Sequence, residues 1–122
     1  TDLILECHAI FCGLFSPQSQ SFDLAPHVIA VLNEIKTPVH SVQCPLGINP
    51  DSGARIGAAV IASSTISLGM PLCGLHRAHD FVGRHYLCDI SITRDLYLKT
   101  GENLTPLFAE QPVIQIFPVT SP

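Results

Sequence analysis

Residues 25–44 read APHVIAVLNEIKTPVHSVQC, and this stretch decides the fold class. Its apolar side chains recur at the spacing of one helix face; they are Val28, Ile29, Val31, Leu32 and Ile35. Asp23 is placed to cap the first turn, Pro26 is tolerated inside it, and Lys36 stands just before Thr37-Pro38, where a helix ends. The pattern predicts a helix over residues 25–36.

A strand is expected on either side of this helix. Residues 2–7 form an aliphatic run typical of a strand buried on both faces, and residues 39–44 form a second run that ends at Pro45 and Gly47. Strand, helix and strand span about forty residues, the size of a β-α-β crossover, so the sequence predicts an α/β fold with a parallel sheet. Further strands are expected at residues 65–68, 85–90 and 113–117, a short helix at 93–99, and loops at 45–53 and 100–106.

The composition limits both size and partners. A length of 122 residues allows one domain, and 47% hydrophobic against 13% charged residues predicts either a dense core or an apolar surface that meets a partner. The net charge is −4 and the six Lys and Arg residues form no run, so strong, unspecific binding of RNA or DNA is not expected. No apolar run is long enough for a transmembrane helix, so no membrane association is expected.

The five cysteines and the first residue bear on the cellular context. The cysteines are irregularly spaced and several lie in apolar runs, which favours buried thiols in a reducing compartment over a disulfide framework. The sequence begins at Thr1, without Met and without a secretion signal pattern, so we expect the natural N-terminus to lie elsewhere.

Several short motifs follow one another along the chain in a characteristic order. They are Asp2-Leu3-Ile4, His8-Ala9-Ile10-Phe11-Cys12, Ser41 to Gly53, Gly57-Ala58-Ala59-Val60, Ser67-Leu68-Gly69-Met70-Pro71 and Gly83 to Ile92. In this order they resemble the YjeF N-terminal family, the NAD(P)H-hydrate epimerases. The resemblance implies a Rossmann-like three-layer sandwich with a mostly parallel sheet. It also implies that residues 1–122 are one partial domain, without the N-terminal half that carries the family's phosphate-binding glycine-rich loop.

Three positions depart from the family pattern. The Asp of the family's S-[IV]-D-[IL]-P motif, its proposed acid/base, falls on Gln43, and an amide cannot exchange a proton near neutral pH. The Asp that binds a monovalent cation falls on His8, and imidazole is a poor ligand for such an ion. The Lys of the G-x-P-K motif falls on Leu72. The resemblance therefore predicts a domain without catalytic residues.

One branch of the family matches best. Tyr86-Leu87-Cys88-Asp89-Ile90, followed by Gly101, Thr105-Pro106 and Phe108, resembles the C-terminal domain of the enhancer of mRNA decapping, a processing-body scaffold. That branch implies a cytoplasmic homodimer in processing bodies that binds decapping-complex proteins, with RNA contacted only by the assembled dimer. The alternatives are an NAD(P)H-hydrate epimerase, with hydrated NAD(P)H and a monovalent cation such as K+, and a nucleotide sensor without turnover. Under the leading hypothesis no cofactor is expected.

Six residues are candidates for ligand binding at the carboxyl ends of the strands, where open α/β sheets bind ligands: His8, Gln43, Pro45, Gly47, Asn49 and Asp89. For Gln43 the favoured interpretation is a hydrogen bond to a loop, and for Asp89 it is a structural role, paired with Arg84 or with loop backbone. Ligand binding is the alternative for both.

Other polar groups suggest chemistry only weakly. His76 and His79 beside Cys73 lack a second ligand pair at zinc spacing, so an exposed loop is expected and no metal site. Cys7, His8 and Cys12 lack an orienting acid and an oxyanion hole, so buried thiols and a loop histidine are expected.

Overall fold

A single five-stranded sheet organises the structure, a computed structural model that describes residues 6–13 and 26–117. Its strands are β1 (Ile10–Cys12), β2 (Val39–Val42), β3 (Ser64–Leu68), β4 (Arg84–Cys88) and β5 (Val113–Ile116). They lie side by side in chain order; β1 to β4 are parallel and β5 runs antiparallel to β4. The predicted α/β fold with a mostly parallel sheet is confirmed.

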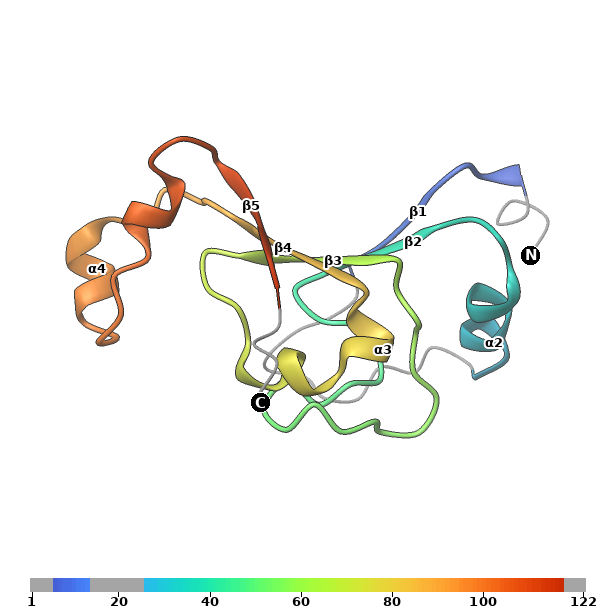
Figure 1. Cartoon of the computed structure of the whole chain (residues 1–122). Coiled ribbons are helices and arrows are strands. Elements are labelled where there is room, and N and C mark those ends of the chain that lie inside the picture. Colours follow the sequence, from blue (N-terminus) through green and yellow to red (C-terminus); the bar gives the residue numbers. More distant parts are fainter. Residues whose placement is uncertain (1–5, 14–25, 118–122) are drawn as a thin grey trace.

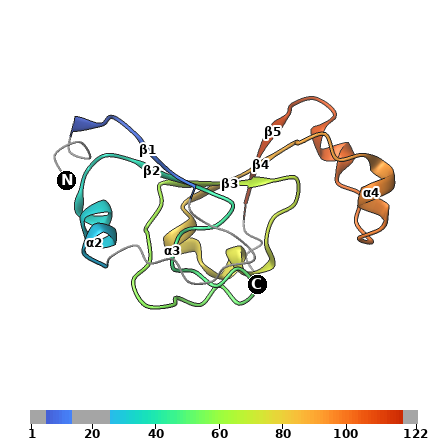
Figure 2. The ribbon, with the colours of Figure 1, turned by 180° about the vertical axis from the view of Figure 1, so that it is seen from behind.

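Short helices connect the strands. They are α2 (Pro26–Glu34), η1 (Cys73–Arg77), α3 (His79–Val82), α4 (Arg94–Leu98) and η2 (Thr105–Phe108). Both views show α2 and α3 on the same side of the sheet, whereas α4 lies beyond its end (Figures 1 and 2). Among the described residues, no helix combines the length and the apolar character that crossing a membrane requires.

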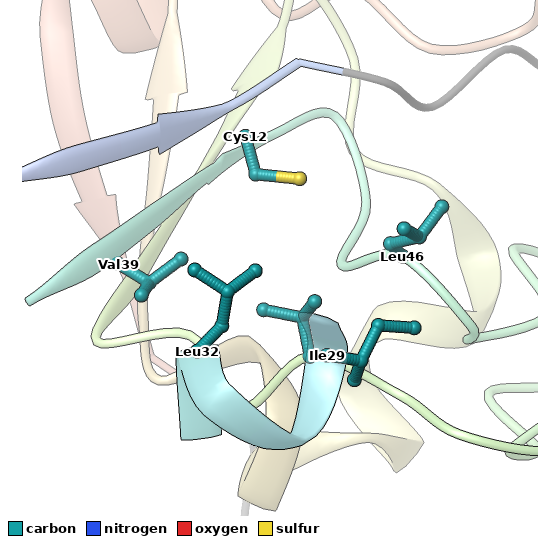
Figure 3. Close-up of a cluster of buried hydrophobic side chains, with 6 residues drawn as sticks. Cys12, Ile29, Leu32, Val39 and Leu46 are labelled. Carbon is teal, nitrogen blue, oxygen red and sulfur yellow. The ribbon is translucent and has the colours of Figure 1, made fainter. Parts of the chain in front are cut away.

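The covered face of the sheet holds the hydrophobic core. Beneath β1 and β2, the sheet packs on helix α2 and on the loop between β2 and β3. This cluster comprises Cys12, Ile29, Leu32, Val39, Leu46 and Val60 (Figure 3). Beneath β3 and β4, a second cluster comprises Cys44, Ile48, Ala59, Leu75, Ala78 and Val82. Each fully buried aliphatic side chain contributes about 1.5–3 kcal/mol, so these contacts stabilise the fold from one side.

A side chain from α2 holds the long loop between β2 and β3 against this core. Asn33 donates Nδ2 to the carbonyl of Ala59 at 2.9 Å and accepts the N–H of Ile61 at Oδ1 at 2.7 Å. Through these two hydrogen bonds the side-chain amide of Asn33 pairs with the loop backbone as a neighbouring strand would. Val60, the loop residue between the two bonded positions, is completely buried. The loop becomes part of the layer that covers the sheet.

The opposite face of the sheet, here called the open face, has no helix over it among the described residues (Figures 1 and 2). The strand register places on it Phe11, His40, Val42, Ser64, Ile66, Leu68, Arg84, Tyr86, Cys88, Val113 and Gln115, with Phe117 just after β5. Phe11 is 76% exposed and Phe117 is 71% exposed. Parallel sheets are normally covered on both faces, whereas the described residues cover only one face of this sheet.

The element boundaries differ from the sequence expectations in a few places. The strand expected at residues 2–7 and the cap at Asp23 fall mainly or wholly outside the described residues; the first described strand is β1, where Ile10 and Phe11 pair with β2. Helix α3 and the two 3₁₀ helices were not predicted, because each spans only one turn and carries no apolar period. The 100–106 segment, expected as loop, ends inside η2, which begins at Thr105.

Candidate functional site

The carboxyl ends of three neighbouring parallel strands meet along one edge of the sheet. Strand β2 is followed by Gln43, β3 by Gly69 and β4 by Asp89. This is the edge at which open α/β sheets bind their ligands. Two of these residues, Gln43 and Asp89, are candidates from the sequence, and the fold brings them to the same edge.

Gln43 occupies an unusual backbone conformation. Its φ of 70° lies in the left-handed region, and the N–H of Cys44 donates to the carbonyl of Val42 at 2.9 Å, so the chain turns within three residues. Its side-chain Oε1 accepts the N–H of Leu68 at 3.3 Å, which extends the hydrogen-bonding between β2 and β3 by one step. The amide of Gln43 therefore holds two strand ends together.

The end of β3 repeats this geometry. Gly69 has a φ of 77°, and the N–H of Met70 donates to the carbonyl of Leu68 at 2.9 Å, so β3 ends in the same tight turn as β2. The hydroxyl of Tyr97, from α4, donates to the carbonyl of Gly69 at 2.7 Å. Burial, and secondarily the negative charge of Asp89, raises the pKa of Tyr97. Sequence reasoning did not place Tyr97 at this edge, since the contact spans 28 residues.

Asp89 is tied into the turn after β4. Its Oδ1 accepts the N–H of Ser91 at 2.9 Å, and Ser91 has a φ of 66°. Its own N–H donates to the carbonyl of Pro112 at 2.8 Å. Of the two structural partners expected for this carboxylate, the loop backbone is the one that bonds to it. This hydrogen bond lowers the cost of keeping a charged group half-buried.

The loop after β2 holds three more candidates, and its polar groups bond mainly within the loop. Pro45 is buried, and Gly47 adopts a φ of 92°. The Oδ1 of Asn49 accepts the N–H groups of Asp51 and Ser52 at 2.9 and 3.1 Å. The Asn49 oxygen is thus engaged in shaping the turn.

His8 lies apart from the other candidates. It precedes β1 at the amino end of that strand, whereas Gln43 and Asp89 follow the carboxyl ends of theirs. Side-chain oxygens of Gln43, Asn49 and Asp89 each accept backbone N–H groups. Leu72, at the position of the family's Lys, is half-buried against the core.

Two further titratable groups have shifted pKa values: Cys44, which is buried just after β2, and His85, which is half-buried within β4. Burial raises the pKa of the Cys44 thiol from 9.0 to about 12, and its Sγ donates to the carbonyl of Ile48 at 3.5 Å. Burial lowers the pKa of His85, whose Nε2 lies 2.6 Å from the Oγ of the fully buried Ser67. The Cys44 thiol therefore stays protonated and unreactive at neutral pH, whereas burial keeps the His85 imidazole in its neutral form.

The weaker sequence candidates are also placed. His76 lies within η1, and His79 is the first residue of α3. Both side chains are exposed, on short helices where a loop was expected. Within the described part of the chain, no three His, Cys, Asp or Glu side chains come together as a metal site. Cys12 is buried in the core, as expected, whereas Cys7, which was also expected to be a buried thiol, is exposed because it precedes β1 and lies outside the core.

The comparisons with known proteins agree on the family. The family described as YjeF-related protein N-terminus matches residues 9–74, slightly more than half of the chain. Two curated relatives are named NAD(P)H-hydrate epimerase. The protein of Truepera radiovictrix is 33% identical over 100 residues, a stretch that covers 82% of this chain and 42% of the relative. The protein of Lentilactobacillus buchneri is 32% identical over 69 residues, which cover 55% of this chain and 32% of the relative.

A solved structure supports the fold. The crystal structure of the yeast protein ynu0 aligns with a TM-score of 0.69 at 19% identity, over 89% of this chain and 46% of that one. The chain thus spans less than half the length of each of these relatives. From the family match and the shared fold, the chain belongs to the YjeF-related protein N-terminus family.

Proposed function

We propose that this chain is the carboxyl-side part of a YjeF-type domain that binds a second copy of itself and has no catalytic activity. The open face carries this proposal. Phe11 and Phe117, at its two ends, are mostly exposed, and Val42, Ile66 and Tyr86 between them are only half-buried. Exposed contiguous apolar surface on a stable domain marks a site of association.

The chemistry at position 43 supports the non-catalytic part of the proposal. Proton transfer at carbon needs a group that gains and loses a proton near neutral pH, and a glutamine amide does neither. Gln43 Oε1 is moreover engaged by the N–H of Leu68, so the side chain has a structural role. Asp89, the nearby carboxylate, accepts a hydrogen bond from Ser91 in its own turn.

The cellular role proposed is that of a cytoplasmic scaffold in mRNA decapping. It rests on the resemblance of Tyr86 to Ile90 to the decapping-enhancer branch, whose residues form β4 and the turn that follows it. In such a protein the domain would join two copies, gather decapping-complex proteins in processing bodies and contact RNA through the assembled dimer. The net charge of −4 fits an RNA contact that depends on assembly or on other parts of the protein.

The alternative is a nicotinamide-nucleotide repair isomerase. Both curated relatives carry the name NAD(P)H-hydrate epimerase, which favours this activity. A nucleotide sensor without turnover is a third hypothesis, because the strand-end loops would persist after the acid is lost. In both cases the nucleotide would lie along the edge formed by Gln43, Gly69 and Asp89.

Three measurements on the full-length protein separate these functions. Sedimentation at micromolar concentration is expected to show a dimer, and a monomer throughout would refute the association. A turnover assay with hydrated NAD(P)H is expected to give no product, and product formation would establish the epimerase. Saturable binding of nicotinamide nucleotides by calorimetry, without turnover, would identify the sensor.

A further inference from the structure

Strand β5 presents an unpaired backbone edge. The N–H of Asp89 donates to the carbonyl of Pro112, which sets the antiparallel ladder so that Ile114 and Ile116 bond to β4. The N–H and C=O groups of the alternate residues, Val113 and Gln115, point away from β4. No described residue bonds to them, so β5 is a free edge of the sheet (Figure 1).

We infer that this edge pairs antiparallel with the β5 edge of a second copy, joining two sheets into one. The inference rests on the proposed self-association and assigns its backbone contact to the sheet edge that borders the open face. When the two-fold axis passes through Gln115, this residue faces the same residue of the second copy. Val113 of each copy then faces Phe117 of the other. Three such pairs exchange about six backbone hydrogen bonds, and the interface is self-complementary as two-fold symmetry requires.

The side chains along the edge favour the same pairing. Residues 111–117 carry no charge, so two copies bring no like charges together, and no Lys interrupts the edge to block association. Val113 is 38% and Phe117 71% exposed, and the pairing sets each against the other on the open face. Cross-strand aromatic and β-branched pairs of this kind stabilise a sheet.

The other edge of the sheet is less suited to self-pairing. In β1 the N–H of Ile10 donates to the carbonyl of Pro38, so Ile10 and Cys12 bond toward β2. Only Phe11 within β1 directs its backbone groups outward. An edge with one outward residue offers a single bonded pair, whereas β5 and Phe117 offer three.

The size of the contact predicts its strength. Four-residue strands and two phenylalanine side chains of about 150–250 Å² each bury less than a standard protein interface. The dimer is therefore expected to be weak and concentration-dependent, with a Kd on the order of micromolar.

A pair of substitutions at the two-fold axis isolates the backbone contact. Gln115→Pro removes an N–H that points away from β4, so the sheet keeps its own bonds while the dimer Kd rises about tenfold or more. Gln115→Ala keeps that N–H and should leave the Kd within about threefold. The readout is sedimentation of the full-length protein, with urea unfolding to establish that both variants are folded.

Disulfide cross-linking tests the register. Antiparallel bonded partners have Cα atoms about 5.5 Å apart, within the range of a disulfide, so Gln115→Cys should form a covalent dimer under mild oxidation. Gln111→Cys, another exposed glutamine, lies far from its own copy in this register and should give only the background of the native thiols.

Each outcome bears on a different claim. A wild-type protein that stays monomeric refutes the proposed self-association itself. A wild-type dimer that Gln115→Pro does not weaken, or that Gln115→Ala weakens equally, refutes the β5 edge and leaves self-association standing. Equal cross-linking at positions 111 and 115 also refutes the register.

Discussion

Gln43 and Leu68 are joined by a hydrogen bond of 3.3 Å between side-chain Oε1 and backbone N–H, although 25 residues separate them in the chain. The bond forms where the ladder between β2 and β3 would otherwise stop, since the chain turns away at Gln43. A polar side chain thus replaces a backbone acceptor at the edge where a ligand would bind.

Substitutions at Gln43 separate this bond from the backbone strain at the same residue. Gln43→Ala loses the acceptor for Leu68 but keeps the left-handed φ, so it should destabilise the fold by about 1 kcal/mol. Gln43→Gly loses the same bond and relieves about 1 kcal/mol of strain, so it should be close to wild type. Urea unfolding measures both; a glycine variant no more stable than the alanine variant would show that φ at this position is not strained.

Gly47 and Gly57 form a matched pair for steric effects, because both have positive φ, of 92° and 68°. A Cβ at Gly47 would lie 2.7 Å from the Cα of Ala59 and would also overlap the carbonyl of Ala58, whereas nothing lies within 4 Å of a Cβ at Gly57. Gly47→Ala should therefore cost about 2–4 kcal/mol and Gly57→Ala about 1 kcal/mol in thermal or urea unfolding. Equal losses would mean that the loop shifts freely at Gly47.

His85 makes stability depend on pH. Burial lowers its pKa in the folded state, so the unfolded chain binds the proton more readily. The stabilising contribution is complete above the ordinary value of 6.5 and is lost as the pH falls from there through the lowered folded pKa. Urea midpoints measured between pH 7.5 and about 5 should fall in the wild type and fall less in His85→Gln. An identical slope in the variant would assign the loss to other groups.

The cysteines should differ sharply in reactivity. Cys44 is 1% exposed and burial raises its pKa to about 12, so its thiolate is scarce at neutral pH, whereas Cys73 is exposed. In the native protein an aromatic disulfide reagent at pH 8 should modify Cys73 quickly and leave Cys44 intact until denaturant is added. Peptide mapping by mass spectrometry assigns the sites, and Cys73→Ser should lower the amplitude of the fast phase without removing the reaction at Cys7, which is also exposed.

Much of the fold could be predicted from local pattern. The apolar spacing of Val28 to Ile35 gave helix α2, and the aliphatic runs that begin near Val39 and Val113 gave strands, because periodicity and β-branching act within a few residues. The antiparallel direction of β5 could not be predicted, since it depends on the path of the long β4–β5 connection, which makes contacts far away in the sequence such as that of Tyr97 with Gly69.

The candidate site was predicted less completely. The motif order placed Gln43 and Asp89 near one edge, and both lie there, at the ends of β2 and β4. The positive φ of Gln43 could not be predicted, because glutamine rarely adopts it and only the surrounding sheet imposes it. The position of His8 at the amino end of β1 likewise depends on where pairing with β2 begins.

The order of the strands has a consequence for how the chain acquires its structure. Among the described strands, each one after β1 pairs with the strand synthesised just before it. Each of them can therefore add to a neighbour that already exists as the chain leaves the ribosome. Among the described strands β5 is synthesised last, so the edge inferred to join two copies forms after β1 to β4.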